Sequence, residues 1–114
     1  MNFDGLVVLI TGASKGIGLC LAKILYEYGA TVIGVYNNTL IKDLLIDTYK
    51  CDISNEEEIK KLFKYVLDKH EKIDVVINCA ALCLDNDIYE KSKDEFMKVL
   101  EVNLVGTFLM CKFA

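Results

Sequence analysis

The chain has 114 residues, of which 54% are hydrophobic and 26% are charged, and its formal net charge is −4 at pH 7. This length suits a single domain, and the apolar fraction is too high for a disordered chain. The mildly acidic balance excludes a broad basic surface for nucleic acid or anionic membrane. No apolar run reaches the roughly 18 residues that a membrane-spanning helix needs, and Met1 to Gly5 lack the basic start of a secretory signal.

The five cysteines are scattered along the chain, at Cys20, Cys51, Cys79, Cys83 and Cys111. Their number is odd, no Cys-x-x-Cys pair occurs, and the chain has a single histidine, so zinc and disulfide sites are poor interpretations. We expect reduced thiols in a cytoplasmic protein and no metal site. Proline is absent, which is typical of a chain that is mostly helix and buried strand.

Short apolar runs rich in β-branched residues alternate along the chain with segments of helical spacing. Each run is brief and mostly apolar, as is typical of a strand buried on both faces of a parallel sheet. The expected strands cover residues 6–10, 31–35, 48–51 and 73–78, and the third is weak. A helix is predicted over 17–28 and ends at Gly29, whereas 39–46 is either a short helix or a loop.

Two further helices begin at capping boxes, in which a serine is followed three residues later by a glutamate. Ser54 with Glu57 opens the clearest helix, and Ser92 with Glu95 opens a long helix that runs toward the C-terminus. The first of these has acidic residues at its start and basic residues at its end, which suits the helix dipole. It also carries the apolar stripe of a core-facing helix, formed by Ile59, Leu62, Phe63, Val66 and Leu67.

The β-α-β-α-β-α-β-α order predicts an α/β fold of three layers, with helices on both faces of a parallel sheet. We expect a doubly wound sheet with strand order 3-2-1-4 and a ligand crevice between strands 1 and 4. Such folds have six or more strands, whereas this chain supplies four, and its last residues are still apolar at Leu109, Met110, Cys111 and Phe113. We therefore expect residues 1–114 to be the N-terminal portion of one longer domain, or a truncated relative of it.

Three glycines follow the first strand, in the segment Thr11-Gly12-Ala13-Ser14-Lys15-Gly16-Ile17-Gly18. Such a loop can bring the N–H groups of a helix start close to a pyrophosphate. Gly12 then permits the sharp turn, Gly16 the close approach of backbone, and Gly18 the packing of helix on sheet; the Ser14 hydroxyl can donate to a phosphate. The G-x3-G-x-G spacing differs from G-x-G-x-x-G and from a P-loop. The alternative is a glycine-rich turn that serves packing only.

This loop resembles the phosphate loop of the short-chain dehydrogenases/reductases, and the resemblance extends along the whole chain. Asp52 in Cys51-Asp52-Ile53-Ser54 is similar to the family's aspartate that reaches the adenine ring. Asn78-Cys79-Ala80-Ala81 resembles the family's Asn-Asn-Ala-Gly, from which it departs at two of four positions. Asn103 resembles the helix asparagine of the family's catalytic tetrad. The likeness is strongest to the single-domain branch that includes the 3-oxoacyl-acyl-carrier-protein reductases, because the extended branch has glycine where this chain has Lys15.

The resemblance implies a Rossmann-type fold and an NAD(P)-dependent oxidoreductase that moves hydride between nicotinamide and a ketone or secondary alcohol. No carboxylate stands at Tyr36, Asn37 or Asn38 to bond a ribose 2′-hydroxyl, and Lys15 resembles a basic residue placed near a 2′-phosphate. NADP(H) is therefore favoured, with NAD(H) as the alternative. The implied catalytic residue is Asn103, and the implied cofactor-binding residues are Gly12, Ser14, Lys15, Gly16, Ile17, Gly18, Asn37, Asp52, Ile53, Asn78, Cys79 and Ala80.

The family's other catalytic groups, a serine and a Tyr-x-x-x-Lys pair, would lie beyond Ala114 by this resemblance. Two Tyr-x-x-x-Lys pairs do occur, and we interpret both as coincidental. Tyr65 and Lys69 precede the fourth strand and are expected to point toward solvent, while Tyr89 and Lys93 straddle the Ser92 cap. A dinucleotide-binding module without catalysis is therefore the alternative hypothesis, and this chain alone is expected to be inactive.

The expected partner is a small carbonyl or alcohol substrate, with an acyl-carrier-protein-linked substrate as one option. Neither nucleic acid nor membrane is expected. The last helix is apolar on more than one side, at Phe96, Val99, Leu100, Leu104, Val105, Phe108 and Leu109. By resemblance this implies a homo-oligomer of the full-length protein; the alternative is that further chain of the same protein buries the helix.

Overall fold

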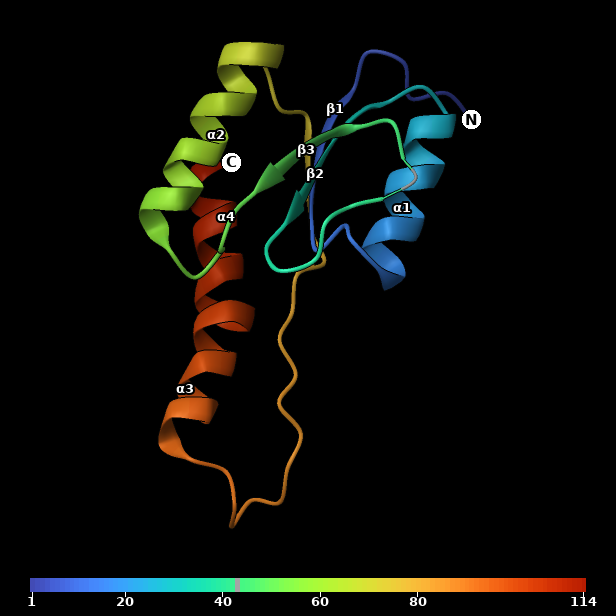
Figure 1. Ribbon diagram of the computed structural model, residues 1–114. Helices are drawn as coiled ribbons and strands as arrows, with labels where there is room; N and C mark the ends of the chain where they lie inside the picture. Colours follow the sequence, from blue (N-terminus) through green and yellow to red (C-terminus); the bar gives the residue numbers. More distant parts are fainter. Residues whose placement is uncertain (43) are drawn as a thin grey trace.

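Four parallel strands form the central sheet in the computed structural model, which describes residues 1–42 and 44–114 (Figure 1). The strands are β1 (Val7–Thr11), β2 (Thr31–Tyr36), β3 (Asp47–Lys50) and β4 (Val75–Asn78). Their order is β3-β2-β1-β4, so the predicted order 3-2-1-4 is confirmed. β1 lies at the centre, where Val8 pairs with both Val32 and Val75. The carboxyl ends of all four strands consequently meet at one edge of the sheet.

Helices cover both faces of the sheet, as the alternation of elements predicts. α1 (Gly16–Glu27) packs on one face, and α2 (Glu56–His70) with α4 (Thr107–Phe113) packs on the other (Figure 1). Successive side chains of β1 enter the two cores in turn: Leu9 lies with α2 and α4, and Ile10 lies with α1. Burial on both faces explains why this strand is apolar without alternation.

The connection between β2 and β3 forms no helix over its described residues, so the loop interpretation of 39–46 is correct there; Asp43 lies outside the described residues. Ile41 and Ile46 of this connection pack directly over β2 at Gly34. A Cβ atom at Gly34 would lie 2.6 Å from Ile41 Cδ1, so a larger residue here would require the ends of the two isoleucine side chains to shift. The connection thereby shields the sheet beside α1 without a helix.

The start of α2 differs from the predicted capping box by one residue. Asn55, not Ser54, is the N-cap: its side-chain oxygen accepts a hydrogen bond from Glu58 N at 3.1 Å. The Ser54 hydroxyl donates instead to Asp52 Oδ1 at 2.7 Å, which removes it from the cap. Leu67, expected in the buried stripe, is 48% exposed, because eight residues of helix turn it about 80° away from Ile59.

The last helical segment is continuous but changes its winding. α3 (Lys93–Leu100) passes into a π-helical segment, η1 (Glu101–Gly106), and then into α4. Ser92 caps α3 as predicted, accepting from Glu95 N at 3.1 Å. The Glu95 carboxylate does not close the box; it accepts from Asn86 Nδ2 at 3.0 Å. No feature of the sequence predicted the π-helical segment.

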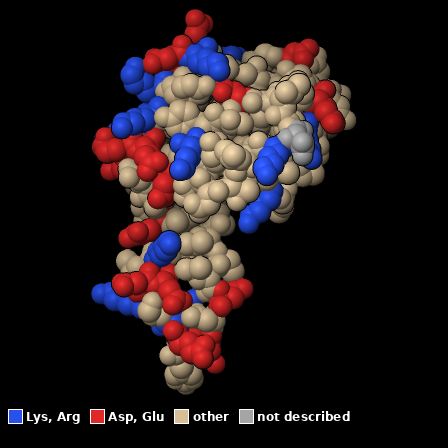
Figure 2. Space-filling view, viewed as in Figure 1, with Lys and Arg blue, Asp and Glu red and all other residues tan. Residues whose placement is uncertain are grey.

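α3 and the segment that follows β4 form an arm, residues 81–100, that projects from the body of the molecule (Figure 1). The arm stretches the chain to 50 × 26 × 22 Å. Acidic side chains gather on it in Figure 2, and they include Asp85, Asp87, Glu90 and Asp94.

Within the described residues, no helix is both long enough and apolar enough to cross a membrane. In the same residues, no cluster of three histidine, cysteine or acidic side chains could hold a metal ion.

All five cysteines are free thiols, and Cys51 is the only one that is buried. Burial raises the pKa of the Cys51 thiol to about 12, and the neighbouring carboxylates of Glu58 and Asp52 act in the same direction. Cys51 therefore stays protonated and behaves as a small apolar side chain of the core.

A polar cluster fastens the end of α2 to the outer strand β3. The Asp47 carboxylate accepts from Tyr65 Oη at 2.8 Å, and it lies 3.1 Å from both Lys69 Nζ and His70 Nε2. Its side chain is only 15% exposed. Burial alone would raise the pKa of Asp47, but the hydrogen bonds from His70, Tyr65 and Lys69 outweigh it and hold the pKa below its usual value.

We expect Asp47→Asn to lower the free energy of unfolding at pH 7 by about 1 kcal/mol, because hydrogen bonds to an ionised group are lost. A carboxyl with a lowered pKa stabilises the folded state above its unfolded pKa of about 4. The difference between wild type and variant should therefore shrink as pH falls below about 4 and the carboxyl becomes protonated. Urea unfolding between pH 3 and pH 7 measures this. Asp68→Asn is the control, since Asp68 pairs only with exposed Lys64; an equal loss there would contradict the role of Asp47.

Candidate functional site

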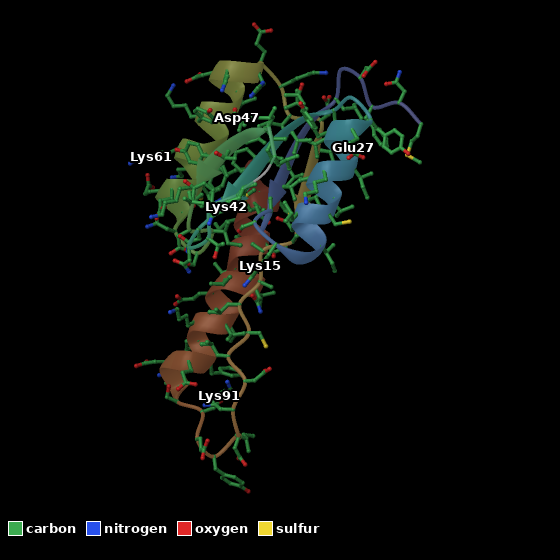
Figure 3. The ribbon with its side chains drawn as sticks, turned by 45° about the vertical axis from the view of Figure 1, so that its right-hand side comes forward. Lys15, Glu27, Lys42, Asp47, Lys61 and Lys91 are labelled. Carbon is green, nitrogen blue, oxygen red and sulfur yellow. The ribbon has the colours of Figure 1, made fainter. Side chains whose placement is uncertain are left out.

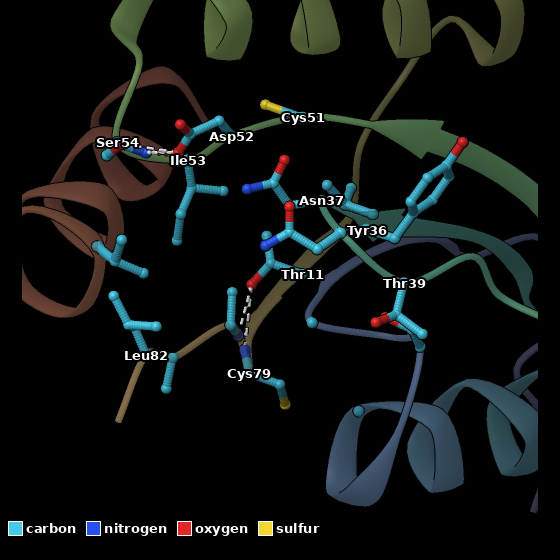
Figure 4. Close-up of a pocket in the computed structure, with 18 of the residues that line it drawn as sticks. Thr11, Tyr36, Asn37, Thr39, Cys51, Asp52, Ile53, Ser54, Cys79 and Leu82 are labelled. Atoms are coloured by element: carbon cyan, nitrogen blue, oxygen red, sulfur yellow. Dashed lines mark hydrogen bonds between the residues drawn. The ribbon is translucent and has the colours of Figure 1, made fainter. Parts of the chain in front are cut away.

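A hollow of about 1000 Å³ opens at the carboxyl edge of the sheet (Figure 4). Its walls come from the ends of β1, β2 and β3, from the segment after β4, and from one face of α3 and η1. This volume is at the upper end of the range for small-molecule and cofactor sites. Eleven of the thirteen residues that the sequence singled out line it: Gly12, Ser14, Lys15, Gly16, Ile17, Gly18, Asn37, Asp52, Ile53, Cys79 and Ala80.

The glycine loop leads from β1 into the N-terminus of α1 at the floor of the hollow. Gly12 and Gly16 have φ of 64° and 60°, a conformation that disfavours side chains. A Cβ at Gly12 would lie 2.7 Å from Ala80 N, and one at Gly18 would lie 2.2 Å from Gly12 O. Gly16 differs, because no atom lies within 4 Å of the position of its Cβ. Gly12 and Gly18 are thus required by packing, whereas Gly16, which also lines the hollow, has open space at its Cβ position among the described residues.

The N-terminus of α1 offers N–H groups to that open space. Among the described residues, no side chain caps the helix, and its first turn has no acidic residue. Lys15 stands at the N-cap position with an extended backbone and an exposed side chain (Figure 3). Ile17 is 76% exposed and lies in the wall of the hollow, so its apolar side chain is available to a ligand. Backbone donors at a helix start, with a lysine beside them, suit an anionic group.

Thr11 joins the end of β1 to the segment after β4. Its side chain is fully buried, and its hydroxyl oxygen accepts from Cys79 N at 3.2 Å and from Ala80 N at 3.1 Å (Figure 4). These two bonds hold the backbone of that segment against Gly12. The wall formed by Cys79 and Ala80 is therefore fixed by backbone contacts, which explains how the Cys79 side chain can depart from the family's asparagine.

Asp52 and Ile53 form the wall that follows β3. Ile53 is buried, while Asp52 is half-buried with its carboxylate at the edge of the hollow (Figure 4). Asn37, directly after β2, is exposed on the same side. The carboxyl ends of neighbouring parallel strands thus bring together residues that are far apart in sequence.

Asn78 and Asn103 do not line this hollow. Asn78 Nδ2 donates to Cys111 Sγ at 3.7 Å. The Asn103 side chain makes a reciprocal pair with the backbone of Leu82: Oδ1 accepts from Leu82 N at 2.7 Å, and Nδ2 donates to Leu82 O at 2.9 Å. Asn103 instead borders a second, smaller hollow within the arm, between α3 and the segment that follows β4. Leu82 lines the first hollow, so Asn103 influences that hollow indirectly, by holding the backbone of Leu82 in place.

The sequence interpretation missed the wall contributed by α3 and η1. Its members share one helical face, with spacing i, i+3, i+4, i+7 and i+8: Asp94, Met97, Lys98, Glu101 and Val102. This face mixes charged and apolar residues, so an apolar stripe could not reveal it. Tyr36, Asn38, Thr39 and Ser54 also line the hollow, and each follows or ends a strand. Tyr36 and Asn38 were already considered for the ribose site from the sequence, and position after a strand end is the signal that could have added Thr39 and Ser54.

Neither Tyr-x-x-x-Lys pair lines the hollow. Tyr65 and Lys69 are in contact at 3.2 Å, but Tyr65 is half-buried against β3 rather than directed to solvent, so that expectation was wrong. The reason is the hydrogen bond from the Tyr65 hydroxyl to Asp47, at the amino end of β3 and far from Lys15 (Figure 3). Tyr89 is 96% exposed and precedes the Ser92 cap, as predicted.

Comparison with known proteins identifies the family. The family model described as short chain dehydrogenase matches residues 6–114. The chain therefore belongs to the short-chain dehydrogenase family, and the predicted Rossmann-type fold is confirmed.

Among curated relatives, a 3-oxoacyl-(acyl-carrier-protein) reductase from Vibrio cholerae is 34% identical over 98% of this chain and 49% of its own length. A short chain aldehyde dehydrogenase from Euphorbia lathyris is 32% identical over 99% and 43%, respectively. The chain thus spans about half the length of the curated relatives it matches.

Solved structures show the same likeness. The ligand-free aldohexose dehydrogenase of Thermoplasma acidophilum superposes with a TM-score of 0.92 at 29% identity, over 97% of this chain and 43% of that one. A short chain dehydrogenase from Leptospira borgpetersenii, solved with bound NAD+, gives a TM-score of 0.86 at 31% identity, over 98% and 45%.

Proposed function

We propose that this chain binds a nicotinamide dinucleotide in the hollow at the carboxyl edge of the sheet. The observation that carries the proposal is the open space in front of Gly16, at an uncapped helix N-terminus. A pyrophosphate placed there would meet backbone N–H groups and the positive end of the α1 dipole. Gly16 and Ser14 would hold the phosphates, and Gly12 and Gly18 would shape the turn.

The rest of the hollow suits the two ends of such a ligand. Asp52 and Ile53 would meet the adenine, and Asn37 the adenosine ribose. Cys79 and Ala80 would bound the nicotinamide half, with Asn78 directly before them in the chain. The similar Leptospira protein was solved with bound NAD+, which supports a dinucleotide site. When bound, the nicotinamide would supply hydride transfer to or from a carbonyl carbon.

We infer that the protein containing this chain is an NAD(P)-dependent oxidoreductase acting on a ketone or a secondary alcohol. Residues 1–114 would form the cofactor-binding portion of a single Rossmann domain. Of the family's catalytic set, Asn103 would be this chain's contribution. The Vibrio cholerae relative, by its name, acts on an acyl-carrier-protein-linked substrate, which is one option for this protein. The exposed apolar residues of α3, η1 and α4 favour a homo-oligomer of the full-length protein: Phe96, Met97, Leu104, Val105 and Phe108.

A dinucleotide-binding module without catalysis is the second candidate, and the position of the two tyrosine–lysine pairs favours it for this chain alone. Both pairs lie outside the hollow. We expect the isolated chain to bind a dinucleotide and to show no turnover of any ketone with NADPH. Detectable reduction of a ketone, measured as loss of NADPH absorbance, would overturn the view that neither pair is catalytic.

The expected cofactor preference is for NADP(H). The chain has no arginine, and Lys15 is the basic residue beside the start of α1. We expect titration calorimetry to give at least about threefold tighter binding of NADPH than of NADH, since one partly exposed charge contact contributes about 1 kcal/mol. Lys15→Gln should remove this preference with little change for NADH. Lys61→Gln, at an exposed position on α2, is the control (Figure 3). Tighter binding of NADH by the wild type would refute the preference.

A further inference from the structure

The carboxylate of Asp52 is held by one of its two oxygens. Oδ1 accepts from Ser54 N at 2.9 Å and from Ser54 Oγ at 2.7 Å (Figure 4). Oδ2 has no hydrogen-bond partner among the described residues, and Asp52 lines the hollow. A carboxylate has a broad, two-fold χ2 torsion, so it rotates freely unless one oxygen is fixed. Two donors on the same oxygen supply that restraint.

The backbone beneath this carboxylate is also anchored. Glu58 Oε1 accepts from Asp52 N at 3.2 Å, and Asn55 N donates to Asp52 O at 3.0 Å. Asn55 caps α2, so the backbone N–H and C=O groups of Asp52 are both tied to the start of that helix. Ser54 differs from Asn55 and Glu58, because it donates hydrogen bonds to the Asp52 side chain, at Oδ1, whereas they bond to the Asp52 backbone.

We propose that Ser54 is a positioning residue that selects a 6-amino purine, a role that rests on the proposed dinucleotide function. By fixing Oδ1, Ser54 would leave Oδ2 as the free acceptor for an N–H group on the edge of the base. An adenine amino group satisfies this acceptor, whereas the C6 carbonyl of hypoxanthine meets it with like polarity. Without the Ser54 hydroxyl, only Ser54 N would hold Oδ1, and ligand binding would have to complete the ordering of the carboxylate, at a cost in affinity.

The test compares NADPH with its hypoxanthine analogue, deamino-NADPH, by titration calorimetry on the full chain. The wild type should bind the adenine form about tenfold more tightly, as expected for one hydrogen bond to a charged group. Ser54→Ala should reduce this ratio about three- to tenfold by weakening the adenine form alone. Ser54→Thr, which keeps the hydroxyl, should retain the ratio. Equal weakening of both ligands in Ser54→Ala, or an unchanged ratio, would show that Ser54 serves only the turn.

The Asp52→Asn variant provides an independent test that keeps Ser54 in place. Because Ser54 donates twice to one oxygen, the asparagine should place its carbonyl oxygen there and turn its NH2 group to the ligand. The preference should then invert toward the hypoxanthine form. A variant without inversion would overturn the proposal even if Ser54→Ala proved unstable.

Two further results keep this proposal separate from the proposed function. Glu57→Gln is the matched control, since Glu57 bonds only to Lys60 on the surface of the same helix turn, and its ratio should equal that of the wild type. If the wild type binds neither dinucleotide, the proposed function fails. If it binds both with a ratio near one, only the role of Ser54 fails.

Discussion

Gly16→Val is expected to weaken dinucleotide binding at least about 100-fold, which corresponds to the loss of roughly two hydrogen bonds to charged phosphate oxygens. A valine there would project into the space that the pyrophosphate is proposed to occupy, since no neighbouring group among the described residues lies within 4 Å of its Cβ position. The loss would arise from excluded backbone approach and not from a clash within the fold. Titration calorimetry with NADPH measures the affinity.

Strain must be separated from this effect, because Gly16 has φ of 60° and a β-branched residue tolerates that region poorly. Gly5→Val is a matched control: Gly5 has φ of 84° and open space around its Cβ position, but it lies outside the hollow. Both variants should lose about 1–2 kcal/mol of stability, and only Gly16→Val should lose binding. Equal effects on affinity, or none at Gly16, would contradict the pyrophosphate site.

Thr11→Val should lower the free energy of unfolding by about 1–3 kcal/mol, because two N–H groups lose their acceptor while the side-chain volume is kept. Thr11 is fully buried, so water cannot replace its hydroxyl without rearrangement. The released groups belong to Cys79 and Ala80, whose backbone lies 2.7–2.8 Å from the Cβ position of Gly12. Loosening that contact should also weaken ligand binding.

Urea unfolding measures the stability of this variant, and amide hydrogen exchange at Cys79 and Ala80 reports the local change. Exchange at these two amides should accelerate more than the global loss of stability accounts for. Thr11→Ser retains the acceptor and loses a methyl group, so it should protect both amides as the wild type does. If Thr11→Ser and Thr11→Val have the same exchange rates, the hydroxyl is not what fixes this segment.

The sheet order could be predicted because each strand is a short apolar run and each crossover has one allowed hand. Val7 to Ile10 are buried on both faces of the central strand, so their run of apolar residues reports their position directly. The glycine loop was also predictable, since Gly12 and Gly18 meet neighbouring backbone that tolerates no Cβ. Backbone conformation and backbone contact constrain sequence strongly, and such constraints can be recognised in one chain.

Side-chain choices among competing partners were not predictable. Ser54 and Asn55 are both good caps, and the choice between them depends on the Asp52 carboxylate, which captures Ser54. Tyr65 was expected in solvent, but Asp47 lies 18 residues away in sequence and binds its hydroxyl. In each case a tertiary partner decided between local alternatives of similar free energy.

The wall supplied by α3 and η1 was missed for a different reason. Its composition is mixed, so neither hydrophobic periodicity nor a motif indicates it, and the helix must first be placed beside the strand ends. The place of Asn103 likewise depends on the path of the arm, which brings Leu82 within reach of its amide group.

The π-helical segment η1 divides one long helix into a part that lines the hollow and a part that is buried in the core. Asp94, Met97 and Lys98 before it, with Glu101 and Val102 at its start, line the hollow; after it, Leu109 and Met110 are buried against the sheet and α2. The wider turn means that these two faces need not share one helical register. Substitutions on the side of this helix that lines the hollow can therefore change the shape of the hollow while the buried residues that hold the helix against the sheet stay the same.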